Sequence, residues 1–183
     1  HVMHERDLAL DLRNVGVAVP YGPVTVTAQH PREYSGSHWC VLVSQTTPKP
    51  TPGSDEISRA YEEGWVGNYA LAFIGDTLSE NGEKVPELFL VELPQDEAGW
   101  KTPGDAPLEG TDSTLPAPPR GVVQRRLTFT HARRFPGLAT VPRHWVRSNP
   151  QATEIAFLMC DEGGIVQLWL ISPQGGAPRQ LTR

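Results

Sequence analysis

A four-part pattern that occurs twice along the chain constrains the fold more than any other feature. The second copy, over 144–182, contains a His-Trp pair, an Ala-Phe run, a Leu-Trp-Leu run and a Leu-Thr pair. The first copy, over 38–128, contains a His-Trp pair, an Ala-Phe run, a Leu-Phe-Leu run and a Leu-Thr pair. Four landmarks recurring in one order indicate an internal structural repeat. We predict that they mark strands A, B, C and D of two successive sheets.

The strands are predicted from apolar, β-branched and aromatic runs that end at Gly, Pro, Asn or Asp. These runs are 8–19, 24–29, 39–45, 69–76, 87–93, 122–130, 145–147, 154–160, 166–172 and 179–182. The stretch 54–63 differs, because Ser54 can cap it, its first turn is acidic, and its apolar residues fall on one helical face. This stretch predicts a short helix in a loop, and the rest of the chain is expected to be β.

The spacing between matching landmarks is uneven, and the excess residues all lie in the first copy. One excess stretch, about 46–68, separates its A and B landmarks and contains the predicted helix. The other, about 95–120, separates its C and D landmarks and is rich in Pro and Gly. We interpret both as loop insertions into a four-stranded sheet whose usual repeat is roughly 40–45 residues.

A four-stranded sheet with two apolar faces buries them by stacking on neighbouring sheets, which is the principle of a β-propeller. We therefore predict an all-β partial β-propeller of four-stranded antiparallel blades. Residues 1–30 would end one blade, 31–130 would form a blade with two loop insertions, and 131–183 would form a regular blade. Propellers close with roughly 4–8 blades and this chain holds about two and a half, so we expect the remaining blades of a longer parent protein as its partners.

Composition excludes several classes of function. The net charge of −5 lacks the basic excess of a nucleic-acid-binding protein. No apolar window approaches the length of a membrane span.

The opening residues HVMHERD are neither a signal peptide nor a natural start, which predicts a segment of a longer protein. Cys40 and Cys160 lie in strand-like apolar runs and are expected to be buried free thiols.

The segment 155–182 reads IAFLMCDEGGIVQLWLISPQGGAPRQLT and resembles the repeat of TolB-type, WD40-like propellers. The stretches 30–44, 59–68 and 115–130 resemble the YidR-like family, a group of bacterial TolB-like proteins without an assigned biochemical role. The resemblance covers essentially the whole chain and implies a propeller of roughly seven blades. It also implies a cytoplasmic protein, although TolB itself is periplasmic, so that both compartments stay open.

Candidate site residues are expected at the mouth of the propeller channel, where loops on a rigid scaffold carry function. The candidate binding residues are His30, Arg32, His38, Trp39, Arg143, His144 and Trp145. Because each His-Trp pair would begin an innermost strand, His38 and His144 are candidate ligands for a shared divalent metal. In the alternative interpretation the pairs are structural, with the Trp packed between blades and the His bonded to a loop carbonyl.

Two functions are compatible with these features. The first is a non-catalytic binding or interaction scaffold for a protein or a saccharide, because no recognisable set of catalytic residues is present. The alternative is a metal-dependent uronate lyase, since oligogalacturonate lyases resemble this design in outline. In that case the metal would assist abstraction of the proton beside a uronate carboxyl group. No other cofactor is predicted, and whether the chain is an enzyme is left open.

Overall fold

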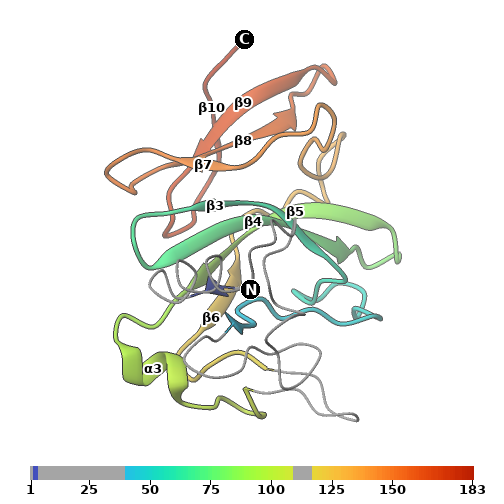
Figure 1. The fold of residues 1–183 in the computed structure, drawn as a ribbon. Helices are drawn as coiled ribbons and strands as arrows, with labels where there is room; N and C mark the ends of the chain where they lie inside the picture. Colours follow the sequence, from blue (N-terminus) through green and yellow to red (C-terminus); the bar gives the residue numbers. More distant parts are fainter. Residues whose placement is uncertain (1, 4–39, 109–116) are drawn as a thin grey trace, which may run out of the picture. The chain divides into compact units, whose positions relative to one another are not determined.

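Residues 2–3, 40–108 and 117–183 are described by a computed structural model (Figure 1). The chain divides into two compact units, one of His1–Ser44 with Pro94–Val122 and the other of Gln45–Leu93 with Val123–Arg183. The described residues are mostly β with very little helix, which confirms the all-β prediction. None of the helices formed by these residues is long and apolar enough to cross a membrane.

The second unit contains two four-stranded antiparallel sheets, in each of which every strand pairs with the next one along the chain. The first sheet consists of β3 (Ala60–Trp65), β4 (Ala70–Leu78), β5 (Lys84–Glu92) and β6 (Val123–Arg126). The second sheet consists of β7 (Arg147–Ser148), β8 (Ile155–Cys160), β9 (Val166–Ile171) and β10 (Arg179–Gln180). Two successive four-stranded sheets agree with the predicted repeat, while their membership of a propeller stays a prediction.

The first unit contains two short strands and a helix among its described residues. Strand β1 (Val2–Met3) pairs antiparallel with β2 (Cys40–Val41). Helix α3 (Glu97–Lys101) is capped by Asp96, whose side chain accepts a hydrogen bond of 2.7 Å from the Gly99 N–H. The helix lies in the stretch that was predicted to be an insertion between strands C and D. That insertion is present, because β5 ends at Glu92 and β6 begins at Val123.

The predicted B and C strands pair as expected in both sheets. The run 69–76 corresponds to β4 and the run 87–93 to β5, and the two pair along their whole lengths. The runs 154–160 and 166–172 correspond to β8 and β9, which also pair with each other. The predicted strands 122–130 and 179–182 are shorter in the structure, as β6 and β10, and the predicted strand 145–147 overlaps β7 only at Arg147. The predicted strands 8–19 and 24–29 lie outside the described residues.

The predicted helix over 54–63 is wrong. Residues 60–65 form β3, which pairs with β4 and completes the first sheet. Ser54 stabilises a turn instead, because its hydroxyl donates to the Thr51 carbonyl at 2.7 Å and accepts from the Glu56 N–H at 3.2 Å. The apolar spacing that suggests a helix face is overridden by strand pairing, a tertiary interaction that local propensity does not reveal.

The predicted position of strand A in the first sheet is also wrong. That position is occupied by β3 rather than by the run 39–45, of which Cys40–Val41 pairs with β1 in the other unit. A tight turn joins β3 to β4, closed by a hydrogen bond of 2.9 Å from the Val66 N–H to the Ala70 carbonyl. The stretch 46–68 is therefore not an insertion between strands A and B.

The C and D landmarks of the repeat have the same hydrogen bonds in both sheets. In the first sheet the Leu88 N–H donates to the Thr128 hydroxyl at 2.8 Å, and the N–H of the residue before Thr128 donates to the Leu88 carbonyl at 2.7 Å. In the second sheet the Leu168 N–H donates to the Thr182 hydroxyl at 2.9 Å, and the N–H of the residue before Thr182 donates to the Leu168 carbonyl at 2.8 Å. The two sheets therefore repeat one another at the level of individual bonds.

The two sheets share one hydrophobic core, and Figure 1 shows them stacked. The first sheet contributes Ala72, Ile74, Leu88 and Leu90, and the second contributes Ile155, Phe157, Met159, Trp169 and Ile171. On the other face of the first sheet, the Phe73 and Phe89 rings stack with their centroids 5.8 Å apart, and both are buried. The first sheet is thus buried on both faces.

Candidate functional site

The first strands of the two sheets, β3 and β7, lie beside each other and bring together residues distant in sequence. The Val146 N–H donates to the Glu62 carbonyl at 3.2 Å. The Ser148 hydroxyl donates to the Trp65 carbonyl at 2.9 Å. The side chains that flank this contact form the candidate site, which we call the β3–β7 edge: Glu62 and Trp65 from β3, with Arg143, His144 and Trp145 from the segment before β7.

Glu62 lies in a β-bulge at this edge. The register of β3 against β4 shifts between Tyr61 and Gly64, and Glu62 has a φ of 55°, in the left-handed region that non-glycine residues rarely adopt. Its side chain is 10% exposed, and its Oε1 atom accepts a hydrogen bond of 2.7 Å from Arg143 Nε. Its Oε2 atom is buried without a hydrogen-bond partner. The bulge therefore directs a mostly buried carboxylate toward the segment before β7.

Arg143 is anchored at one end and open to solvent at the other. Its side chain is 73% exposed, although its Nε atom is bonded to Glu62. Its guanidinium carbon lies 5.0 Å from the centroid of the Trp145 ring, and Trp145 is itself 46% exposed. A guanidinium offers five N–H donors in a planar fork that matches carboxylate and phosphate groups. Arg143 and Trp145 can therefore bind an anionic group beside an aromatic surface.

His144 uses both ring nitrogens to bond the backbone. Its Nε2 atom accepts a hydrogen bond of 3.3 Å from the Leu158 N–H, and its Nδ1 atom lies 3.2 Å from the Pro142 carbonyl oxygen. Because Nε2 accepts, the ring proton is on Nδ1 and is donated to Pro142. The ring therefore ties the loop before β7 to β8, and a metal would have to displace one of these bonds.

Four of the predicted site residues, His30, Arg32, His38 and Trp39, lie outside the described residues. A metal site shared by His38 and His144 thus stays a prediction. Within the described ranges, no three His, Cys, Asp or Glu side chains gather in a way that would hold a metal ion. The structure does bring Arg143 and Trp145 together.

Sequence reasoning missed Glu62 and Trp65, because it assigned most of this stretch to a helix. A usable signal was present: the run that ends at Trp65 is followed by Gly67 and Asn68 and then by another apolar run. Two such runs separated by a short Gly- and Asn-containing turn are typical of a β-hairpin.

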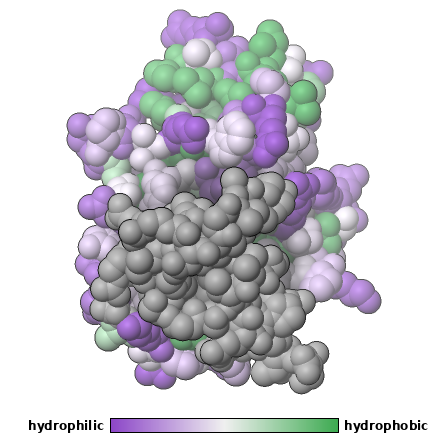
Figure 2. Space-filling view, in the orientation of Figure 1, coloured by the Kyte–Doolittle hydropathy of each residue, from purple (hydrophilic) through white to green (hydrophobic). Residues whose placement is uncertain are grey.

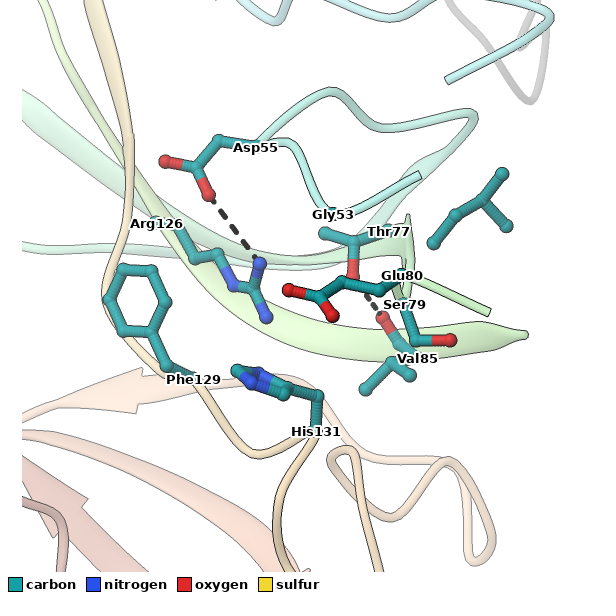
Figure 3. Close-up of a pocket in the computed structure, with 10 residues that line it drawn as sticks. Gly53, Asp55, Thr77, Ser79, Glu80, Val85, Arg126, Phe129 and His131 are labelled. Carbon is teal, nitrogen blue, oxygen red and sulfur yellow. Dashed lines mark hydrogen bonds and ion pairs between the residues drawn. The ribbon is translucent and has the colours of Figure 1, made fainter. Parts of the chain in front are cut away.

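A separate pocket of about 100 Å³ lies at the other end of β4 and β5 (Figure 3). Figure 3 shows the Arg126 guanidinium between Asp55 and His131, with the Glu80 carboxylate directed toward it. Arg126 is only 6% exposed and forms an ion pair with Asp55 at 3.4 Å. The guanidinium also lies 4.7 Å from the centroid of the Phe129 ring. The cation of this pocket is thus already paired within the protein.

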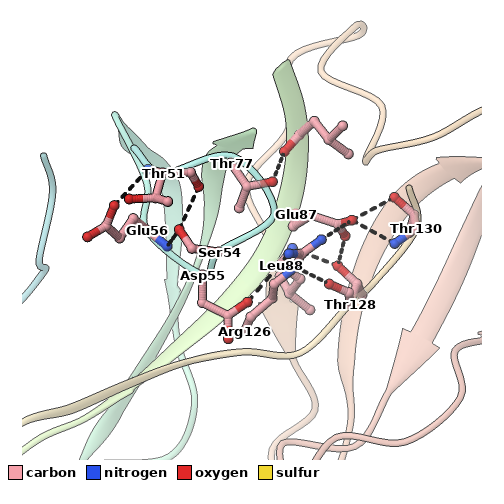
Figure 4. A network of polar contacts seen from close by, with 11 residues as sticks. Thr51, Ser54, Asp55, Glu56, Thr77, Glu87, Leu88, Arg126, Thr128 and Thr130 are labelled. Carbon is pink, nitrogen blue, oxygen red and sulfur yellow. Dashed lines mark hydrogen bonds and ion pairs between the residues drawn. The ribbon is translucent and has the colours of Figure 1, made fainter. Parts of the chain in front are cut away.

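The same guanidinium belongs to a buried polar network centred on Glu87 (Figure 4). The Glu87 carboxylate is fully buried and accepts hydrogen bonds from Arg126 Nη2 at 2.9 Å and from the Thr128 hydroxyl. It also accepts from the Thr130 N–H at 2.6 Å and from the Thr130 hydroxyl at 2.8 Å. A buried carboxylate with this many partners holds strand ends and loops in place. We therefore assign Glu87 and Arg126 a structural role, and the β3–β7 edge remains the candidate site.

Comparison with known proteins gives a close relative without an assigned activity. The chain is 82% identical over 182 residues to the uncharacterized protein YidR of Escherichia coli (strain K12). The match covers 100% of this chain but 44% of the relative, so the chain spans less than half of the relative's length. A family model described as a protein of unknown function (DUF3748) matches residues 1–34. No solved structure matches the chain. The chain is thus similar, from end to end, to one stretch of a longer YidR protein.

Proposed function

We propose that this chain is a segment of a non-catalytic binding scaffold, built from adjacent blades of a TolB-like propeller, and that it binds its ligand at the β3–β7 edge. The observation that carries this proposal is the exposed Arg143 guanidinium, which rests on Trp145 and is anchored by Glu62. An exposed arginine whose orientation is fixed by a mostly buried carboxylate is preorganised to bind an anion.

The arrangement of the sheets supports the propeller part of the proposal. Two successive sheets repeat the same bonds between strands C and D, and they stack on a common core. Their first strands, β3 and β7, lie side by side, as the innermost strands of neighbouring blades do around a channel. A ligand at this edge would therefore lie at the channel, on the most rigid part of such a scaffold.

The chemistry of the edge favours a carboxylate-bearing saccharide. The guanidinium of Arg143 matches a carboxylate in bidentate geometry. Trp145, which is 46% exposed, offers apolar surface beside it, on which the C–H face of a sugar ring can pack. A protein partner would need two side chains to contact both residues, an acidic one at Arg143 and an apolar one at Trp145. A single uronate ring carries the carboxylate and the apolar C–H face together, which is why we favour the saccharide.

Isothermal titration of the chain with oligogalacturonate tests this proposal. Arg143→Ala is expected to weaken binding about tenfold, equivalent to about 1.4 kcal/mol, because one charge-assisted contact is lost. Arg179→Ala is the matched control, since Arg179 is also exposed and also paired with a glutamate, at 2.9 Å from Glu154. Failure to bind oligogalacturonate would contradict the proposal, and so would an equal loss in the two variants. Binding of acidic peptides alone would replace the saccharide by a protein partner.

The alternative, a metal-dependent uronate lyase, requires a His144 that is free to bind a metal. In the structure both of its ring nitrogens bond the backbone, which favours the binding scaffold. Elemental analysis after native purification separates the two functions. A divalent metal bound in stoichiometric amount and lost on His144→Ala, together with an unsaturated product from oligogalacturonate, would favour the lyase.

A further inference from the structure

The second sheet has an apolar face that points away from the first sheet. Along β8 and β9 the residues alternate, so that Ile155, Phe157 and Met159 are buried against the first sheet, at 0–1% exposure. The opposite face carries Ala156, Leu158, Cys160, Val166, Leu168 and Leu170, which we call the outer face. All six are partly exposed, and Figure 2 shows apolar surface over the region that Figure 1 draws as this sheet.

The repeated hydrogen bonds identify the equivalent face of the first sheet. Leu88 and Leu168 make the same hydrogen bonds and therefore hold the same position in their sheets. The residues that pair with them, and those two positions away along the strands, are then equivalent as well. The equivalent pairs are Ala72 and Ala156, Ile74 and Leu158, Leu88 and Leu168, and Leu90 and Leu170. Their residue types are nearly the same. The outer face of the second sheet is thus the counterpart of the Ala72, Ile74, Leu88 and Leu90 face of the first.

That face of the first sheet is completely covered. Ala72, Ile74 and Leu88 are 0% exposed and Leu90 is 2% exposed, because the second sheet packs its large apolar side chains against them. The difference is clear at the edge of the face as well. Leu127, directly after β6, is 2% exposed, whereas its counterpart Leu181, directly after β10, is 50% exposed. Equivalent residues are therefore buried in one sheet and open in the other.

We propose that the outer face of the second sheet docks a further four-stranded antiparallel sheet, supplied by polypeptide that lies outside this chain. The covering sheet would present large apolar side chains, as Ile155, Phe157 and Trp169 do toward the first sheet. More than half of the YidR relative lies outside the matched stretch, which leaves room for such sheets. This inference rests on the stacked-blade part of the proposed function and not on the ligand of the β3–β7 edge.

A polar contact at the rim indicates how the docked sheet would be oriented. Arg125 pairs with Leu90 in the first sheet, and its Nη2 atom bonds the Pro173 carbonyl in the turn between β9 and β10 of the second sheet. Arg179 pairs with Leu170 and holds the equivalent position. We expect Arg179 to bond a carbonyl in the turn between the third and fourth strands of the docked sheet.

A second copy of this chain is a poorer occupant. The observed packing joins two different faces: a leucine-rich face on the first sheet receives a Phe- and Trp-containing face of the second. In another copy, the Phe157 face is already packed against the first sheet of that copy. The Phe73 and Phe89 face of its first sheet is also buried, at 4% and 1% exposure. A copy could therefore offer only its own outer face, which does not reproduce the observed packing.

Cys160 allows a direct test, because it lies on the outer face opposite Val166 and is partly exposed. Its rate of maleimide labelling, read by peptide mass spectrometry, would be compared in two proteins. One is the 183-residue chain, and the other is the full-length relative with these residues set in place of its matching stretch. We expect labelling about tenfold slower in the full-length protein, because thiol reactivity requires exposure. A cysteine introduced by Glu162→Cys, in the exposed turn after β8, should label equally in both.

A second measurement keeps the test independent of thiol chemistry. Leu168→Asp should lower the unfolding temperature of the full-length protein more than that of the 183-residue chain, whereas Phe157→Asp should lower both. Equal Cys160 labelling in the two proteins would contradict the proposal. Slower labelling of the shorter chain at rising concentration, with a dimer on size exclusion, would also contradict it and would identify a second copy as the occupant.

Discussion

A Cβ atom at Gly64 would lie 2.1 Å from the carbonyl oxygen of Val146. The two sheets therefore meet backbone to backbone at this point, where the Val146 N–H also donates to the Glu62 carbonyl. Only glycine permits so close an approach, since any other residue would place a carbon atom inside the contact distance of that oxygen. This contact fixes the positions of β3 and β7, and with them the β3–β7 edge.

Gly64→Ala should therefore destabilise the chain by about 3 kcal/mol, because a backbone carbonyl cannot move aside as a side chain would. Gly82→Ala is the matched control: a Cβ atom there would have no neighbour within 4 Å, and the φ of +80° is the source of strain. We expect a loss of about 1 kcal/mol at Gly82. Urea unfolding monitored by tryptophan fluorescence measures both. Equal losses at the two positions would show that β3 and β7 are not held together in this way.

Glu87 and Gln167 hold equivalent places in the two sheets and provide a comparison of a charged with a neutral network. The Glu87 carboxylate accepts a hydrogen bond from the Thr128 hydroxyl, and the Gln167 side-chain oxygen accepts one from the Thr182 hydroxyl at 2.6 Å. Glu87→Ala should cost about 3 kcal/mol, because it leaves Arg126 without its buried partner. Gln167→Ala should cost about 1 kcal/mol, as for a neutral hydrogen bond. Chemical denaturation of each variant gives the two values, and the reverse order would contradict the structural role of Glu87.

Tyr61 gives the chain a pH dependence at high pH. Burial of the phenol and its hydrogen bond of 2.8 Å to Asp76 raise the pKa of Tyr61 above its ordinary value of 10.0. A raised pKa means that the folded state holds this proton more tightly than the unfolded state. The stabilisation is therefore complete below about pH 10 and is lost as the pH rises above it.

Tyr61→Phe should lower the free energy of unfolding by about 1 kcal/mol at about pH 8, because the buried Asp76 loses a donor. The difference between the variant and the original chain should shrink as the pH rises above about 10. Urea unfolding between about pH 8 and pH 11 measures it. A difference that stays constant over this range would mean that the phenol proton is not held by the fold.

Glu62 is expected to position Arg143 rather than to touch the ligand. Glu62→Gln should change stability by less than about 1 kcal/mol, because Arg143 is 73% exposed and its ion pair is screened by solvent. It should nevertheless weaken oligogalacturonate binding several-fold, since the guanidinium is no longer fixed. In an Arg143→Ala background the same substitution should have no further effect on affinity. An additive effect in the double variant would instead indicate direct contact between Glu62 and the ligand.

The sequence predicts the paired strands of each sheet well, because their signals are local. The β8–β9 hairpin combines alternating apolar residues with a turn in which the Asp161 carboxylate accepts from the Gly163 and Ile165 N–H groups at 2.9 and 3.0 Å. Strand β3 is not predictable in the same way. Glu62 and its neighbour Glu63 form a bulge that interrupts the alternation of a regular strand, and the turn at Gly67 and Asn68 is the one local signal of a hairpin there.

The candidate site is only partly predictable for a similar reason. The His-Trp landmark points to Arg143, His144 and Trp145, but nothing near them in sequence indicates that Glu62 is the partner of Arg143. The roles of His144 and Arg126 are also set by distant residues, through Leu158 and through Glu87. Sequence patterns locate these residues on strands and loops, whereas their chemistry depends on contacts that the fold creates.

Hydrogen–deuterium exchange of the chain with and without oligogalacturonate locates the segments that the saccharide covers. A binding scaffold with its site at the β3–β7 edge predicts slower exchange in residues 60–65 and 143–148 when the saccharide is bound, while the mass of the recovered saccharide stays unchanged. Protection confined to the Arg126 pocket, no protection anywhere, or a cleaved saccharide would contradict it.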